Sequence, residues 1–327
     1  MVPRKQTEST ALAALALMLV TAVWGSTFFL IKDLLTQVSA ADFLAARFTL
    51  AAVVGAVVFH RQLRAASLPV WRRGVTLGAI YFLAQLLQTV GLHTTDASVS
   101  GFITGIYVVL TPIIVALFFR ERLSGRIWLA SAITTVGLMV LSLRGLSVGG
   151  GEGITFLSAV LYALHIALMG RWARGANPFA FAVIQMMVIA AFSTVFALPG
   201  GIALPRTTGA WVALVYMALV AGLGAMVAQS WAQGLLHPAT AAIIMVTEPV
   251  FAAFFAVVFG GEFVTGRLLV GGSLIFVAML LTEVGGAIFK RRGRVGPPRD
   301  EPALVDEAPA GKPPSPTPAL LPTGPGE

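Results

Sequence analysis

Long apolar runs dominate this chain, and short polar segments separate them. Most runs reach the roughly 20 residues that an α-helix needs to cross about 30 Å of hydrocarbon. They lack the period-two alternation of membrane barrel strands. Since backbone groups in lipid must pair within their own segment, we expect helices. The ten expected spans are 11–31, 39–59, 72–92, 97–119, 127–143, 153–172, 179–199, 209–231, 239–260 and 266–289.

Composition supports this interpretation. Of the 327 residues, 57% are hydrophobic and 11% are charged, and the mean hydropathy is +0.88. A soluble domain commonly has about a quarter of its residues charged, so most of this surface must face lipid. The absence of cysteine excludes disulfides and thiol chemistry. We therefore expect an all-α integral membrane protein.

The charges between the spans predict its orientation. The net charge of +8 is compatible with nucleic acid, but the basic residues lie in short loops, where membrane topology requires them. With the N-terminus in the cytoplasm, fifteen basic residues lie inside and four outside. This bias predicts a multi-pass protein of the cell (plasma) membrane with both termini cytoplasmic and an even number of spans. No small-residue cleavage pattern follows the first span, so we expect a retained helix rather than a signal peptide.

The chain also contains a weak internal repeat. Five spans in each copy give the second copy the opposite orientation, an inverted repeat that favours inward-open and outward-open conformations. We expect ten transmembrane helices as two inverted five-helix repeats. The expected parts are a cytoplasmic N-terminus (1–10), two repeats (11–145 and 151–292) and a disordered cytoplasmic tail (295–327). The matched pairs are Trp24 with Tyr162, Phe43 with Phe181 and Arg47 with Gln185 at a spacing of 138 residues, and Ala97 with Ala239 and Glu121 with Glu262 at 141–142.

Two charged residues lie deep inside the spans. Glu248 is about 14 Å into the ninth span at 1.5 Å per residue. A carboxyl group at that depth is costly to ionise and is a functional candidate by default. Pro249 follows it and weakens the helix, which suits a site for a substrate ammonium or for proton coupling. Arg47 is about 12 Å inside the second span, where it could attract an anion, hold a gate closed or serve structure alone.

Polar and aromatic residues add further candidates. Gln85 and Gln88 share a helix face, as do Gln229 and Gln233, and each pair could line a cavity or join helices by hydrogen bonds. The mid-span residues Trp24, Tyr107 and Tyr162 could stack on a substrate. His165 is interpreted as a packing residue or a gate residue.

Short motifs recur in a fixed order along the spans. They are 22–28, Arg47-Phe48, 101–109, 121–124, 239–242, Glu248-Pro249 and Gly261-Glu262. Through these motifs the chain resembles the drug/metabolite transporter superfamily, specifically the EamA type, over about 1–290. Arg120 departs from the usual pattern, in which Gly precedes the Glu. The resemblance implies a ten-helix carrier in which helices 1, 3, 4, 6, 8 and 9 line a cavity, and helices 5 and 10 pack at the periphery or at a dimer contact.

Together these arguments predict a secondary transporter that moves a small metabolite, such as an amino acid or a derivative, by alternating access, with export as the expected direction. The alternatives are a multidrug exporter, an integral membrane enzyme acting on lipid and a non-transporting sensor. We expect no enzymatic activity, no cofactor, no metal and no nucleic acid; proton coupling and a homodimer stay open. The predicted substrate-binding residues are Trp24, Thr27, Gln85, Gln88, Tyr107, Tyr162, Gln229 and Glu248, and the predicted coupling or gate residues are Glu248, Arg47 and His165.

Overall fold

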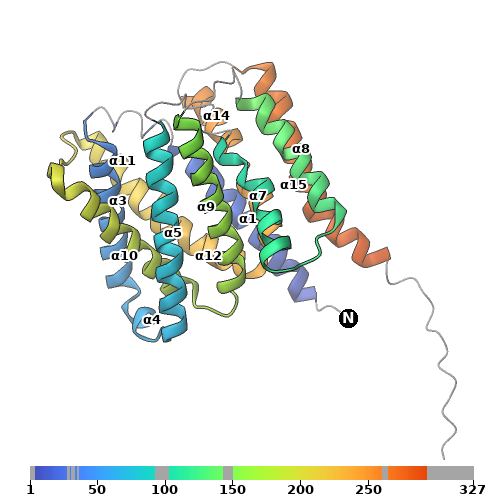
Figure 1. Cartoon of the computed structure of the whole chain (residues 1–327), viewed down its shortest axis with the longest axis horizontal. Coiled ribbons are helices and arrows are strands. Elements are labelled where there is room, and N and C mark those ends of the chain that lie inside the picture. The colour runs from blue at the N-terminus through green and yellow to red at the C-terminus, as the bar shows by residue number, and fades with distance from the viewer. Residues whose placement is uncertain are drawn as a thin grey trace, which may run out of the picture.

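The computed structural model describes residues 4–27, 30, 34, 37–92, 103–142, 150–259 and 264–292. Within these residues the chain forms helices and turns, with no strand. Figure 1 shows the helices gathered in a bundle. The expected tail at 295–327 lies outside the described residues.

The helices follow the apolar runs closely. Six helical segments are long and apolar enough to cross a membrane, and four more are shorter but apolar. This arrangement makes the chain a multi-pass membrane protein. The helices are α1 (Arg4–Gly25), α3 (Ala40–Val58), α4 (His60–Arg64), α5 (Leu68–Leu92), α7 (Tyr107–Phe118), α8 (Gly125–Ser142), α9 (Gly150–Trp172), α10 (Pro178–Ala197), the 3-10 turn η1 (Leu198–Gly200), α11 (Thr208–Ala218), the π-helical turn η2 (Leu219–Gly224), α12 (Ala225–Leu235), α13 (Pro238–Met245), α14 (Glu248–Phe259) and α15 (Gly266–Arg292).

Polar residues at the ends of the runs fix where several helices begin. The Ser39 hydroxyl accepts a hydrogen bond from the Asp42 amide at the start of α3. Asn177 and His237 cap α10 and α13 in the same way, and each is followed by a proline. A cap satisfies an amide that has no partner inside the helix, and proline has no amide to satisfy.

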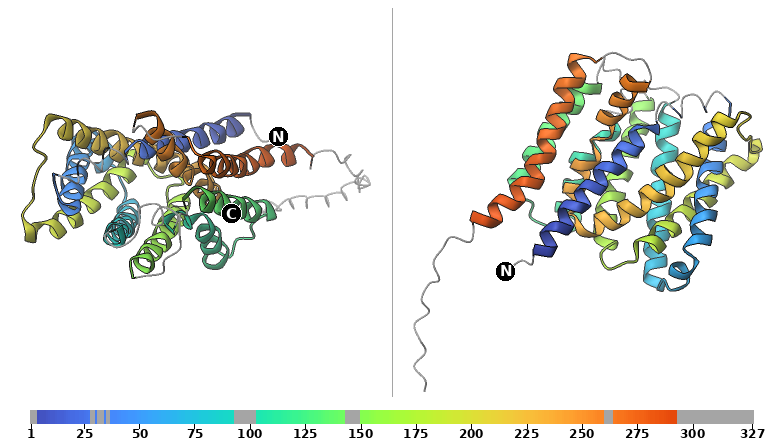
Figure 2. Two further views of the ribbon diagram at one scale, coloured as in Figure 1. Left: turned by 90° about the horizontal axis from the view of Figure 1, so that it is seen from above. Right: turned by 180° about the vertical axis from the view of Figure 1, so that it is seen from behind.

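Helices from the two halves of the sequence pack against each other. In the bundle α5 contacts α9 and α10, α10 contacts α3, and α1 contacts α12 and α14. The long helices α8 and α15 lie side by side at one edge (Figures 1 and 2). Phe48 and Phe181, which are 2% and 0% exposed, lie in one buried cluster. Large apolar residues such as Phe118 and Val57 remain on the outside, as lipid contact requires.

Three of the apolar segments are irregular at mid-span. Segment 208–235 contains the π turn η2, and segment 238–259 is interrupted by a turn at Val246 and Thr247. Pro112 lies inside α7 and removes the amide that would bond the Val108 carbonyl. The Ser131 hydroxyl of α8 donates to that carbonyl at 3.3 Å. Irregular backbone in a membrane is tolerated where protein or a cavity surrounds it.

Candidate functional site

Glu248 lies at the interruption between α13 and α14. It is the first residue of α14, and Pro249 follows it, so the helix breaks where the sequence predicted a weak point. Its side chain is partly exposed although it lies about halfway along the segment. No hydrogen-bond partner for its carboxyl group is present in the part of the chain that the structure describes. The carboxyl group therefore has bonding capacity left for a ligand.

Four ionisable side chains from other helices lie near enough to Glu248 for a charge on one to affect the other. They are Arg47 on α3, Tyr81 on α5, Tyr107 on α7 and Tyr162 on α9. Arg47 and Glu248 do not form an ion pair within 4 Å. Three of the four, Arg47, Tyr107 and Tyr162, are residues that the sequence predicted, and they come from both of its halves.

Arg47 is held by the protein around it. Its side chain is 9% exposed, and its Nε donates to the Met217 carbonyl oxygen of α11 at 3.1 Å. The guanidinium carbon lies 5.8 Å from the Phe43 ring centre and 5.1 Å from that of Phe48. These contacts fix the positive charge in place, and attraction to aromatic rings offsets part of the cost of burying it.

A chain of hydrogen bonds joins α5, α9 and the start of the α7 segment. The Tyr162 hydroxyl donates to Gln88 Oε1 at 3.1 Å, and Gln88 Nε2 donates to Thr104 Oγ1 at 3.0 Å. One helical turn away, Gln85 Nε2 donates to the Tyr81 hydroxyl at 3.2 Å. The rings of Tyr81 and Tyr162 meet edge to face, with centres 5.7 Å apart. Both predicted glutamines of α5 therefore belong to one network.

A related contact occurs in the second half of the sequence. Gln229 Nε2 lies 3.8 Å from the Met245 sulfur, and these two residues are each 141 positions after Gln88 and Thr104. The same spacing relates Tyr107 to Glu248. Gln229 is fully buried, and within the described ranges its Oε1 has no hydrogen-bond partner.

Gln233, one turn further along α12, shares this environment. Its Nε2 lies 3.1 Å from the same sulfur of Met245. Its Oε1 is also buried without a partner among the residues the structure describes. Two unsatisfied amide oxygens therefore lie on one face of α12, where each costs free energy unless a ligand or water bonds it.

The other predicted residues lie beside this centre or apart from it. His165 Nε2 is 3.0 Å from Gln185 Oε1, and its ring centre is 5.1 Å from that of Tyr81. Trp24 Nε1 donates to the Ala221 carbonyl oxygen of η2 at 2.8 Å. The Thr27 hydroxyl donates to the Trp24 carbonyl oxygen, three residues earlier in the chain, at 2.7 Å. His165 borders the tyrosine network, whereas the polar atoms of Trp24 and Thr27 are engaged elsewhere.

The sequence interpretation missed Tyr81 and Thr104. Tyr81 lies four residues before Gln85 and seven before Gln88, so helical periodicity alone could have placed it on the same face. Thr104 belongs to the site because Gln88 donates a hydrogen bond to it, and no feature of the sequence around Thr104 predicts that bond. Among the described residues, no group of three or more His, Cys, Asp and Glu side chains could hold a metal ion.

Comparisons with known proteins agree with this architecture. Residues 11–143 and 150–284 each match the EamA-like transporter family. An uncharacterized transporter of Archaeoglobus fulgidus is 31% identical over 273 residues, which cover 83% of this chain and 86% of that protein. A solved crystal structure with 18% identity has the same fold, with a TM-score of 0.70 over 87% of this chain and 99% of that one. Two matches that together span most of the sequence place this chain in the EamA-like transporter family.

Proposed function

We propose that this membrane transporter is a secondary carrier that moves a small polar metabolite out of the cell by alternating access. In this proposal the apolar segments form ten membrane spans, arranged as two inverted repeats at 11–145 and 151–292. The six long and four shorter apolar helices support that count. The related contacts of Gln88 and Gln229 support the repeat. We place the protein in the cell membrane with both termini in the cytoplasm.

The observation that carries the proposal is Glu248. A carboxyl group at mid-depth is costly unless a partner compensates it. Here it lies at a break in the helix, without a hydrogen-bond partner in the described structure, and Arg47 supplies a positive charge near it. Carriers commonly bind substrates at such interrupted helices near the middle of the bilayer.

The chemistry of the site favours a ligand with hydrogen-bond donors. Glu248 supplies carboxylate oxygens, and Gln229 and Gln233 supply amide oxygens without partners in the described part of the chain. A protonated amine would bond the Glu248 carboxylate and compensate its charge, and further donor groups of the ligand would satisfy the two amide oxygens. Tyr107 and Tyr162 offer ring faces to the rest of the molecule. In the alternative form of the mechanism, Glu248 exchanges a proton instead of binding the amine.

Two variants of Glu248 test this assignment. Substrates are first identified as metabolites whose export differs between cells with and without the protein. Counterflow of a labelled substrate is then measured in proteoliposomes. We expect Glu248→Gln to insert and fold normally but to transport at least about tenfold more slowly, because an interaction with a charged group is lost. Loss of pH dependence in this variant would identify proton coupling.

The comparison with Glu248→Ala supplies the control. A structural glutamate would tolerate Gln much better than Ala, since Gln fills the same volume and still forms hydrogen bonds. Near-normal transport by Glu248→Gln, together with a misfolded Glu248→Ala, would reject the functional role. A multidrug exporter would instead show counterflow of many unrelated cations.

A further inference from the structure

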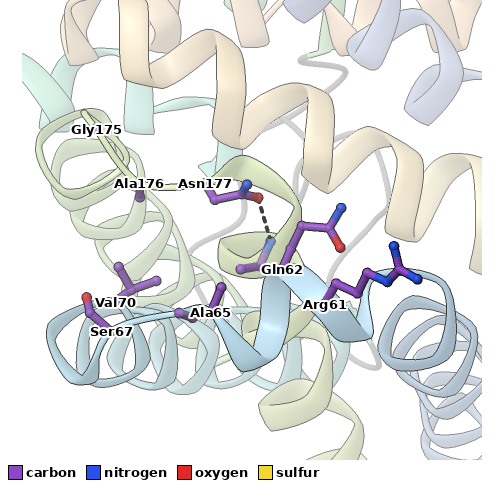
Figure 3. Close-up of a pocket in the computed structure, with 10 residues that line it drawn as sticks. Arg61, Gln62, Ala65, Ser67, Val70, Gly175, Ala176 and Asn177 are labelled. Atoms are coloured by element: carbon purple, nitrogen blue, oxygen red, sulfur yellow. Dashed lines mark hydrogen bonds between the residues drawn. The ribbon is translucent and has the colours of Figure 1, made fainter.

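A second polar region lies at the end of the bundle that carries α4. It is a pocket of about 450 Å³ between α4, the start of α5 and the turn that joins α9 to α10. Figure 3 shows Arg61, Gln62 and Asn177 beside one another at this place. None of the residues predicted for transport lines it. We call it the α4 pocket.

The short helix α4 is fixed on one side and open on the other. Phe59 and Leu63 pack against a buried apolar cluster, and the Phe59 ring centre lies 4.7 Å from that of Phe179. No residue of α4 itself is buried. The anchoring residues thus leave Arg61 and Gln62 outside the core, where both line the pocket.

The pocket offers hydrogen-bond donors without an acid to neutralise them. Arg61, Gln62, Ser67 and Asn177 line it, and no acidic residue does. In the Asn177 side chain, Oδ1 already accepts hydrogen bonds from the backbone amides of Phe179 and Ala180, which leaves Nδ2 as a donor. Donors around a cation match the oxygens of a phosphate group, which Arg binds through a planar fork.

The surrounding sequence strengthens the positive field. Residues 60–73 contain four arginines and neither aspartate nor glutamate. Two of them, Arg72 and Arg73, are exposed in the second turn of α5, shortly after Val70, which lines the pocket. Clusters of this size next to a membrane span attract anionic lipids.

The pocket also borders lipid-facing surface. Leu68 and Phe179 are 62% and 37% exposed, and in the sequence they adjoin the lining residues Ser67 and Ala180. Its wall is apolar on one side, with Val70, Ala65 and Ala176. Gly175 lies in the turn with a φ of 75°, and a residue with a side chain would adopt this backbone conformation only with strain. A ligand with a phosphate and an attached hydrocarbon part would meet both kinds of surface.

We propose that the α4 pocket binds the phosphodiester headgroup of an anionic phospholipid of the cytoplasmic leaflet. Arg61 contacts the phosphate, Gln62 and Asn177 hydrogen-bond its oxygens, and the acyl chains lie along Leu68 and Phe179. This site is independent of Glu248 and of the transported substrate.

Lipid retention by the purified full chain tests the proposal. The protein is incubated with phosphatidylglycerol or with phosphatidylcholine, and bound lipid is measured by native mass spectrometry. We expect phosphatidylglycerol to be retained and phosphatidylcholine not. Arg61→Gln should retain about fivefold less phosphatidylglycerol, the contribution of one arginine near an anionic surface. The matched control is Arg206→Gln, which removes one exposed arginine near the start of α11 and should leave retention unchanged.

Competition separates a lipid from a soluble anion. Inorganic phosphate and glycerol 3-phosphate should fail to displace phosphatidylglycerol, and efficient displacement by either would overturn the lipid assignment. Equal retention by the wild type and a folded Arg61→Gln would overturn the site itself.

Should Arg61→Gln not fold, Gln62→Cys gives a chain with a single cysteine, since the natural chain has none. Phosphatidylglycerol must then slow thiol labelling at this position more than phosphatidylcholine does, and equal labelling rates would reject the proposal.

Discussion

Gln88 and Gln229 occupy related positions in the two halves of the chain, yet their amides have different surroundings. Gln88 accepts a hydrogen bond from the Tyr162 hydroxyl and donates one to Thr104. The polar contact of the Gln229 side chain is with the Met245 sulfur, at 3.8 Å, and its Oε1 has no hydrogen-bond partner in the described residues. The first half thus has a completed polar network, while the second half keeps hydrogen-bonding capacity beside Met245, three residues before Glu248.

The difference arises from the aromatic residues that the repeat pairs. Tyr162 corresponds to Trp24 at a spacing of 138 residues. The tyrosine hydroxyl reaches Gln88, whereas the Trp24 indole donates its one proton to the Ala221 carbonyl of η2. The indole proton is therefore used by the π turn and does not satisfy Gln229. A wide turn of this kind is common at functional sites.

The largest expected effect is on transport by Gln229→Leu. If Gln229 binds substrate, removing its amide should slow counterflow about tenfold, the loss of one well-formed hydrogen bond. Stability should be unchanged or higher, because the variant removes a buried carbonyl oxygen that lacks a partner. Thermal unfolding in detergent and proteoliposome counterflow measure the two quantities. Unchanged transport would assign Gln229 to packing alone.

Gln88→Leu should show the opposite pattern in stability. It leaves Tyr162 and Thr104 without their shared partner, so we expect a loss of about 1 kcal/mol, since hydrogen bonds between membrane helices contribute about 0.6 kcal/mol each. The free energy of unfolding in mixed detergent micelles measures this loss. A stability equal to that of Gln229→Leu would show that the two halves do not differ as described.

The smallest effect is expected at the end of the bundle, where the two halves meet through exposed charges. Glu121 is 3.6 Å from Arg171 and 3.1 Å from His237. Such exposed pairs contribute little, so Glu121→Gln should cost about 0.5 kcal/mol or less. The related Glu262 lies outside the described residues. A cost for Glu121→Gln above that of Gln88→Leu would mean that the ends, rather than the interior, hold the halves together.

The sequence predicted the membrane spans better than the site. Hydropathy reports contact with lipid, so the helix boundaries mostly agree within a few residues. The first span contains an interruption that hydropathy did not predict: α1 ends at Gly25, a turn follows at Ser26, and Thr27 and Leu30 are again helical. There the Ser26 hydroxyl bonds the Val23 carbonyl, and a side chain on Gly25 would collide with Phe251. Such close contacts between distant helices leave no signal in a local apolar pattern.

The partners inside the site were harder to predict. In a membrane helix both the lipid face and the buried face are apolar, so the pattern does not fix how the helix is rotated about its axis. Glu248 could be found because a charge at mid-depth is rare. Three hydrogen bonds of the site depend on that rotation. They join Gln88 to Thr104, Trp24 to the Ala221 carbonyl of η2, and Gln85 to Tyr81.

The break before Glu248 also affects how the site can be emptied. As the first residue of α14, Glu248 lies at the N-terminal end of the helix dipole, which is equivalent to a positive charge of about half an elementary charge. The backbone therefore compensates part of the carboxylate charge even without a bound cation. In the proposed transport cycle, the charge imbalance left after a cationic substrate departs would be smaller than in an unbroken helix, so the empty carrier would return at a lower electrostatic cost.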